Sequence, residues 1–255
     1  MTTPEQADGP VHTGPILRIE TTPAEVAEAV GTLFEQIVAR LDEWRTLVAG
    51  YGDSASSGGL DALVEELVLA DLAQPDPLFI GAGFIAADDV VNGSDVHFSW
   101  WLGPVEGNPI LKRTTHPTKL DLATRIHTEY LRDFRSLEWY RIPETTRHAH
   151  VTGPYVDHLC TCEYILTITV PVYAVDRMTG ADRMIGVVGV DVAVRTLESR
   201  LLPLFLDCST ALALLSDGGR VILSTDPTVS PGSLLTAPRR LPCPTTPFAD
   251  RKSVV

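Results

Sequence analysis

One acidic side chain lies within an otherwise apolar run of this 255-residue sequence. Asp191 falls in the segment Ile185–Val194, where side chains of a strand alternate between faces, so it shares a face with Gly189. Burying a carboxylate without a partner is costly, so it needs a cation, hydrogen-bond donors or water. We interpret Asp191 as the acceptor for a ligand ammonium or hydroxyl, with Gly189 making room. The alternative is that Asp191 binds neighbouring backbone or an internal arginine.

Two threonines could extend this polar site onto a second strand. The segment Tyr164–Ala174 is rich in β-branched residues and is expected to be a strand. Thr167 and Thr169 would then lie on one of its faces. Such a face suits either the mildly polar wall of a cavity or the half-exposed side of a sheet.

Four further side chains are candidates for the same pocket. Tyr155 and Asp157 are separated by one residue, so they would share a face of an extended segment. Trp139 and Tyr140 could wall a pocket, because each ring combines an apolar body with a polar tip. The alternative for the two rings is ordinary core packing, which we expect for one of them.

A cluster of metal-ligating residue types offers a competing interpretation. It comprises His148, His150, His158, Cys160 and Cys162. Imidazole and thiolate bind zinc and iron, but the spacings are H-x-H and C-x-C without the second paired element of a zinc finger. We therefore favour a surface cluster and expect neither a metal nor a cofactor, with a metal-binding protein as the alternative function.

Sequence motifs of common enzyme classes are absent. The sequence has no G-x-S-x-G elbow, phosphate-binding glycine loop, H-E-x-x-H or dinucleotide fingerprint. A thiolate pair of His158 with Cys160 or Cys162 remains conceivable, but neighbours in sequence rarely have that geometry. We expect a binding protein and not an enzyme.

The composition restricts the partners and the compartment. A net charge of −13 disfavours nucleic acid and anionic lipid, because no basic excess displaces counterions. The start of the chain has no secretory leader pattern, and the apolar runs are shorter than a membrane span. The four cysteines form no spaced framework and are expected to be reduced. These features predict a soluble cytoplasmic protein that contacts neither nucleic acid nor membrane.

Two helices are predicted in the first third of the chain. Residues 1–21 should be irregular, and Thr22, Pro23 and Glu25 form a capping-box pattern that begins a long helix over 22–50. Its apolar stripe contains Val26, Val30, Leu33, Phe34, Ile37, Leu41, Trp44 and Val48. The stripe either covers the domain's own sheet or pairs with a second copy, so a dimerisation module without a ligand is another alternative. A second helix is predicted over 60–70.

The rest of the chain predicts an antiparallel sheet with helices among its strands. Strands are expected in the core 78–226, with a hairpin around Asp217-Gly218-Gly219 and a helical pattern over 122–134. This is an α+β class, in one domain spanning 22–226. The proline-rich segment 227–255 is expected to be irregular or disordered.

An ordered set of motifs between Glu138 and Thr225 resembles the Cache family of small-molecule sensor domains. The matching pieces are Trp139-Tyr140, VTGPYVD from Val151, the strand LTITVPV from Leu166, and IGVVGVDV from Ile185, followed by a helix and the Asp-Gly-Gly-Arg hairpin. The resemblance implies a PAS-like antiparallel sheet flanked by helices, with a long N-terminal helix that often mediates dimers. It also implies a sensor that binds a small molecule and signals through a separate partner.

Members that bind amino acids carry a residue pattern that this sequence follows in part. The pattern is a Tyr, an Arg five residues later, a Trp-Tyr pair, then a Tyr and an Asp. It is matched in order by Tyr130, Arg135, Trp139, Tyr140, Tyr155 and Asp191. The Trp-Tyr pair falls two residues late, which leaves Arg135, Arg141 or Arg132 as the possible carboxylate clamp, and for Arg132 we prefer a surface role. The expected ligand is an amino acid, an amine or a small carboxylate.

Overall fold

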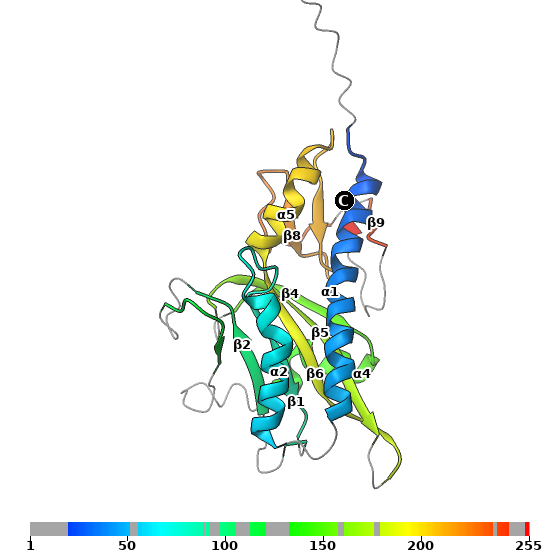
Figure 1. Ribbon diagram of the computed structural model, residues 1–255. Helices are drawn as coiled ribbons and strands as arrows, with labels where there is room; N and C mark the ends of the chain where they lie inside the picture. Colours follow the sequence, from blue (N-terminus) through cyan, green and yellow to red (C-terminus); the bar gives the residue numbers. More distant parts are fainter. Residues whose placement is uncertain are drawn as a thin grey trace, which may run out of the picture.

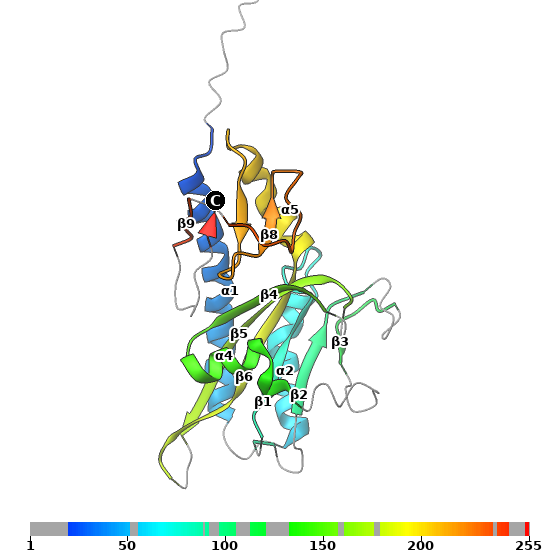
Figure 2. The same ribbon diagram turned by 180° about the vertical axis from the view of Figure 1, so that it is seen from behind.

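The computed structural model describes residues 20–51, 56–88, 90–91, 97–105, 113–120, 133–157, 161–175, 179–236, 239–244 and 253–254. Two sheets of different size share one long helix, α1 (Pro23–Tyr51), which runs along both of them (Figures 1 and 2). The expected helix cap is present: the Thr22 amide donates to Glu25 Oε2 at 2.8 Å, and the Glu25 amide donates to Thr22 Oγ1 at 3.3 Å.

The larger sheet has six strands in the order β3-β2-β1-β6-β5-β4, and all neighbouring pairs are antiparallel. Its strands are β1 (Gly81–Ala86), β2 (His97–Leu102), β3 (Thr118–Lys119), β4 (His150–Val156), β5 (Tyr164–Val175) and β6 (Asp182–Ala193). The two central strands β1 and β6 pair along their length, with Gly81 opposite Asp191 and Gly83 opposite Gly189. The α+β class and the antiparallel sheet predicted from the sequence are therefore confirmed.

One face of this sheet is covered by α1 and by α2 (Ser57–Leu72), as Figure 1 shows. The buried apolar stripe of α1 packs here, because alternate residues of β5 and β6 point at it. The stripe predicted from the sequence thus covers the chain's own sheet; Leu33 is partly buried and the other seven members are fully buried. Val188, Val190 and Val192 belong to this layer, so the alternation inferred for β6 is correct.

The opposite face carries α4 (Glu138–Thr146), which follows the short 3-10 turn η1 (Phe134–Ser136) and is seen in front of the sheet in Figure 2. A smaller apolar layer fills the space beneath it. Its buried members are Ile85, Trp100, Leu102, Leu120, Phe134, Tyr140 and Val187. The helical pattern expected over 122–134 lies mostly outside the described residues.

The second sheet has four strands in the order β8-β7-β10-β9. These are β7 (Ala213–Leu215), β8 (Val221–Ser224), β9 (Leu241–Pro242) and β10 (Ser253–Val254). The helix α5 (Val194–Leu206) continues directly from β6 and leads into this sheet. Both β9 and β10 contact α1.

The segment 227–255, expected to be irregular, therefore contributes two short strands to this sheet. Cys243 is buried against the main core, and a Cβ on Gly31 of α1 would lie 2.2 Å from the Pro244 carbonyl oxygen. Two-residue strands have no detectable periodicity, which explains why the sequence pattern did not reveal them. Among the described helices, none is long and apolar enough to cross a lipid bilayer.

Candidate functional site

Asp191 lies at the middle of the larger sheet, on the face that carries α4. Its direct cross-strand neighbours are Gly81 on β1 and Thr167 on β5. Residues opposite each other in antiparallel strands share a face, so these three side-chain positions form one row. The carboxyl is 5% exposed, which places an acidic group inside the protein, as the sequence indicated.

The two carboxyl oxygens of Asp191 have different surroundings. Thr167 Oγ1 donates to Oδ1 at 2.6 Å. No hydrogen-bond partner contacts Oδ2 within the described part of the chain, and this oxygen faces the position above Gly81, where a Cβ would lie 3.1 Å away. Asp191 is therefore not neutralised by an arginine or by backbone donors of the described residues, which was the alternative interpretation.

Burial determines the protonation of Asp191. Removal from water, reinforced by the negative charge of Asp157, raises the pKa of Asp191 to about 8, against the lowering effect of the Thr167 hydrogen bond. Without a bound cation the carboxyl is then mostly protonated at neutral pH. A ligand cation placed against Oδ2 would reverse this, because an opposite charge favours the ionised form.

Tyr155 extends the polar row to the fourth strand of the site. Its phenolic oxygen lies 2.7 Å from Thr167 Oγ1. Because the Thr167 hydroxyl proton is already donated to Asp191, Tyr155 is the donor in this contact. The three side chains thus form a chain of hydrogen bonds directed at one carboxyl oxygen, and this fixes the orientation of Asp191.

Trp100 on β2 is a member of this face that sequence reasoning missed. Its side chain lies across β1, with Nε1 3.0 Å from the position of a Gly81 Cβ and Cη2 3.5 Å from that of a Gly189 Cβ. Gly189 therefore leaves room for this indole and for the Thr169 methyl, and not for a ligand as we inferred. Two glycines far apart in sequence accommodate the ring, a relation that only the pairing of β1 with β6 reveals.

The pair at the start of α4 has divided roles. Tyr140 is fully buried, its ring packs edge-to-face on Phe134 at 4.7 Å, and burial raises its pKa to about 12. Trp139 is only partly buried and stacks on Phe134 with 6.1 Å between ring centroids. Its carbonyl accepts a hydrogen bond from Thr169 Oγ1 at 2.6 Å, which ties α4 to β5. Tyr140 is thus a core residue, as we expected for one of the pair.

Asp157 is buried, but its carboxyl forms hydrogen bonds within its own loop and not with Asp191. Its Oδ2 accepts from the Thr161 amide at 2.8 Å and from Thr161 Oγ1 at 3.0 Å. These contacts close the turn that connects β4 with β5, where residues 158–160 lie outside the described part. Asp157 acts on the site through its charge, which adds to the burial effect on Asp191.

The arginines expected to clamp a carboxylate lie elsewhere or outside the described residues. Arg135 Nη2 forms an ion pair with Asp88 Oδ2 at 2.6 Å, and both side chains are more than 40% exposed. Arg141 is exposed on α4. Tyr130 and Arg132 fall outside the described residues. The polar row around Asp191 thus contains no arginine from the described part of the chain.

The expected histidine–cysteine cluster is only partly described, since His158 and Cys160 fall outside. His148 is exposed and Cys162 is an exposed free thiol, whereas His150 is buried and contacts Glu138 Oε1 at 3.3 Å. No group of three or more metal-ligating side chains exists among the residues that the structure describes.

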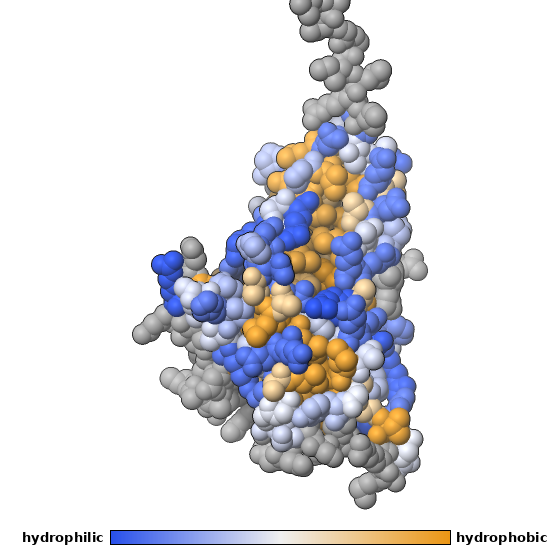
Figure 3. All heavy atoms as spheres, in the orientation of Figure 1, coloured by the Kyte–Doolittle hydropathy of each residue, from blue (hydrophilic) through white to orange (hydrophobic). Residues whose placement is uncertain are grey.

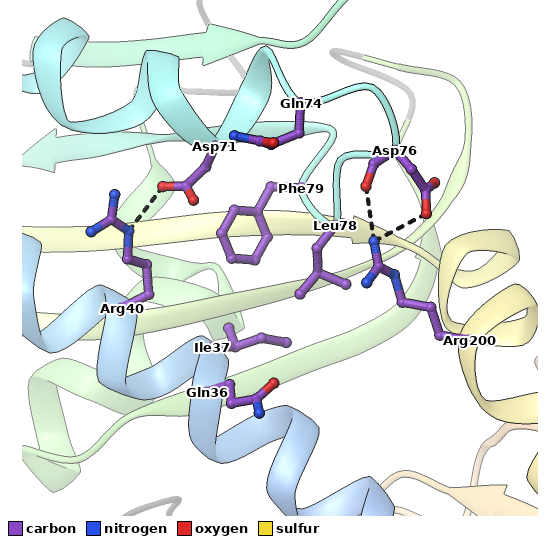
Figure 4. Close-up of a pocket in the computed structure, with 9 residues that line it drawn as sticks. All are labelled: Gln36, Ile37, Arg40, Asp71, Gln74, Asp76, Leu78, Phe79 and Arg200. Carbon is purple, nitrogen blue, oxygen red and sulfur yellow. Dashed lines mark hydrogen bonds and ion pairs between the residues drawn. The ribbon is translucent and has the colours of Figure 1, made fainter.

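A cavity of about 340 Å³ lies on the other side of the sheet from Asp191, between α1, α2 and α5. Ile37, Leu78 and Phe79 are its apolar lining, and apolar side chains reach the surface between α1 and α2 (Figures 3 and 4). An ion pair lies at each end: Arg40 Nε contacts Asp71 Oδ2 at 2.9 Å, and Arg200 Nη2 contacts Asp76 Oδ2 at 3.4 Å. Arg200 Nη2 also donates a hydrogen bond to the Asp76 carbonyl oxygen at 2.9 Å.

These charged groups are occupied by one another, so the cavity offers no free cation or carboxylate comparable to Asp191 Oδ2. Its contacts connect α1 with α2 and α5 with the loop before β1. We regard it as a junction between helices.

No protein-family model matches the chain, and no curated protein matches it. Solved structures do match its fold. A methyl-accepting chemotaxis protein X is 17% identical, with 90% of this chain and 93% of that chain covered and a TM-score of 0.59. The ligand-binding domain of the Pseudomonas aeruginosa PAO1 amino-acid chemoreceptor PctC is 18% identical, covers 90% and 93%, and has a TM-score of 0.55.

The ligand-binding domain of the Pseudomonas fluorescens chemoreceptor CtaA is 15% identical, covers 90% of this chain and 85% of that chain, and has a TM-score of 0.54. These neighbours are receptor ligand-binding domains and not enzymes. The match of this chain's fold, with its antiparallel sheet and long N-terminal helix, to these domains agrees with the resemblance inferred from the motifs between Glu138 and Thr225. The protein therefore has the PAS-like α+β fold of the Cache-type sensor domains.

Proposed function

We propose that this protein is a small-molecule sensor that binds an amine-bearing ligand, an amino acid or a simple amine, on the α4 side of the larger sheet. The observation that carries the proposal is the buried Asp191 carboxyl, whose Oδ1 is held by Thr167 while Oδ2 has no partner among the described residues. A primary ammonium supplies both a positive countercharge and the hydrogen-bond donors that this oxygen lacks.

The ligands of the structural neighbours support this proposal. PctC was solved with GABA, CtaA with L-isoleucine and with L-valine, and PctB with L-arginine. All four ligands carry an ammonium group. In our proposal Tyr155 and Thr167 orient Asp191, Trp139 forms part of the wall of the site, and Asp157 adds negative potential.

A thermal-shift screen of amino acids, amines and small organic acids tests the proposal. A ligand at one hundred times its Kd stabilises the native state by about 2.7 kcal/mol. For a chain of this size that corresponds to a rise in Tm of several degrees. Asp191→Ala should abolish the shift, whereas the control Asp71→Asn, on the other side of the sheet, should keep it. A screen in which wild type and Asp191→Ala are equally unaffected by every compound would reject the proposal.

We propose a binding role without catalysis. Tyr155 bonds Thr167, and Thr167 in turn donates to Asp191 Oδ1, so this chain of hydrogen bonds holds the carboxyl in an arrangement suited to receiving a cation. Incubation of any stabilising compound with the protein, followed by mass spectrometry, should recover that compound unchanged.

We propose that the protein works in the cytoplasm. The support is chemical: Cys162 and Cys208 are free thiols that are exposed or partly exposed, a state that a reducing compartment maintains. Cell fractionation with an antibody against the chain tests this directly, and recovery from an extracytoplasmic fraction would refute it.

We propose that the output passes to a separate regulatory protein through α5. This helix continues from the strand that carries Asp191, and it exposes Leu204 and Leu206, the latter by 63%. A homodimer through α1 is also part of the proposal, but it must use the outer side of that helix, because the inner stripe is buried. Hydrogen exchange with and without a stabilising ligand should change along α5, and sedimentation should show the dimer.

A further inference from the structure

Trp100 presents a buried hydrogen-bond donor that nothing in the described protein satisfies. The side chain is 5% exposed, and Nε1 has no hydrogen-bond partner among the described residues. An unpaired buried donor lowers the stability of the folded protein, so a ligand that supplies an acceptor for it is bound more tightly.

The unpaired N–H lies beside the free oxygen of Asp191. A Cβ on Gly81 would lie 3.0 Å from Trp100 Nε1 and 3.1 Å from Asp191 Oδ2. Leu102 Cδ2 also lies 3.1 Å from that point, so the position is closely surrounded and holds no ligand atom itself. Because the donor and the acceptor each lie about 3 Å from the same point, they are close neighbours, and two adjacent polar groups of one ligand could contact them.

A second unpaired group lies on the same face. Thr152 is 8% exposed, its Oγ1 has no partner among the described residues, and it pairs across the strands with Thr167. The row around Asp191 therefore has more neutral polar groups available than one ammonium would use. It provides no described arginine for a carboxylate, since Arg135 is paired with Asp88 at the surface.

We propose that Trp100 is a specificity-determining ligand-binding residue, whose indole N–H donates to an oxygen on the carbon skeleton next to the ammonium received by Asp191. The inference rests on the proposed function and narrows its ligand class to small primary amines with a hydroxyl, amide or carboxylate oxygen beside the amine. An ammonium cannot itself accept a hydrogen bond, so both groups of the ligand are needed to satisfy both protein atoms.

Three related probes test this inference: L-valinol, L-valinamide and isobutylamine, of which the last lacks the oxygen. Trp100→Phe keeps a ring and removes the N–H. It should weaken binding of L-valinol and L-valinamide about fivefold to tenfold, the loss expected for one hydrogen bond, and change isobutylamine binding less than twofold. Trp101→Phe, the adjacent residue on the opposite face, is the control and should leave all three affinities unchanged.

A spectroscopic readout avoids dependence on the variant's stability. The chain has four tryptophans, so wild type gives at most four indole N–H signals, and the one missing in Trp100→Phe is assigned to Trp100. In wild type this signal should move on addition of L-valinol and stay nearly fixed with isobutylamine.

The outcomes separate the two proposals. If the probes bind but Trp100→Phe weakens all three equally, or the indole signal responds equally to all three, the role of Trp100 is refuted while the sensor function stands. If no probe stabilises wild type and the amino-acid and amine screen is also negative, the sensor function fails and this inference fails with it.

Discussion

Replacing Asp191 by Asn should remove a large pH dependence from the stability of the protein measured without added ligand. The pKa of Asp191 is raised from 3.8 to about 8 by burial and by the charge of Asp157. Because the folded-state pKa is above the unfolded value, the native state holds a proton that the unfolded state releases between these two values. The associated stability is fully present below pH 4 and is lost as the pH rises through about 8.

The size of the effect follows from the width of that window. One pKa unit is worth about 1.4 kcal/mol, so wild type should lose up to about 3 kcal/mol between pH 5.5 and pH 7.5 from this group alone. Asn has nearly the same shape, and its amide oxygen can accept the Thr167 hydrogen bond, but it does not titrate. The stability difference between Asp191→Asn and wild type should therefore shift in favour of the variant by about that amount.

Urea unfolding of both proteins at pH 5.5 and pH 7.5, without ligand, measures this difference. All other titrating groups are shared, so their contributions cancel in the comparison. Asp71→Asn, which removes a partly exposed carboxyl, should parallel wild type at both values. If Asp191→Asn also parallels wild type to within about 0.5 kcal/mol, a scatter typical of extrapolated unfolding energies, the raised pKa and the electrostatic argument for the site are wrong.

Three further predictions use simple measurements. Because a cation must ionise Asp191, the affinity for isobutylamine should rise about tenfold from pH 6 to pH 7 and level off as the pH passes about 8. Proton release should be visible by calorimetry in buffers of different ionisation enthalpy, and a flat affinity profile contradicts this. Arg135→Ala should change unfolding free energy by less than about 1 kcal/mol and leave probe affinity intact, and a tenfold loss would make it the clamp after all. Gly31→Ala should lower the free energy of unfolding by about 1–3 kcal/mol, because the new Cβ meets the Pro244 carbonyl. The control Gly50→Ala, whose Cβ would point into open space, should raise it slightly. Equal effects of the two variants would show that the C-terminal segment does not pack on α1.

Local patterns were sufficient to predict much of the fold. The capping box at Thr22 and Glu25 fixed the beginning of α1, and alternation in β5 and β6 gave the correct face for Thr167 and Asp191. These signals are local because capping joins residues three apart, and strand alternation needs only the neighbouring positions.

Non-local relations could not be predicted in the same way. Trp100 joins the site because Gly81 and Gly189 lie on paired strands. The residue spacing within β2 does not predict this pairing. The helix α4 contains Pro143, which weakens a helical pattern. Arg135 lies in η1, which directs its side chain to Asp88 at the surface. The two-residue shift of the Trp-Tyr pair in the sequence indicated that Arg135 was a doubtful carboxylate clamp, but it could not show where the side chain lies.

The helix α1 has a consequence for how the whole molecule melts. Since its buried side packs on β5 and β6 and it also contacts β9 and β10, neither sheet can lose structure without exposing part of the same helix. The two sheets should therefore unfold in one cooperative transition, with equal calorimetric and van't Hoff enthalpies, although each has its own hydrogen-bond network. The helix that links the sheets in the folded state thus also couples their stabilities.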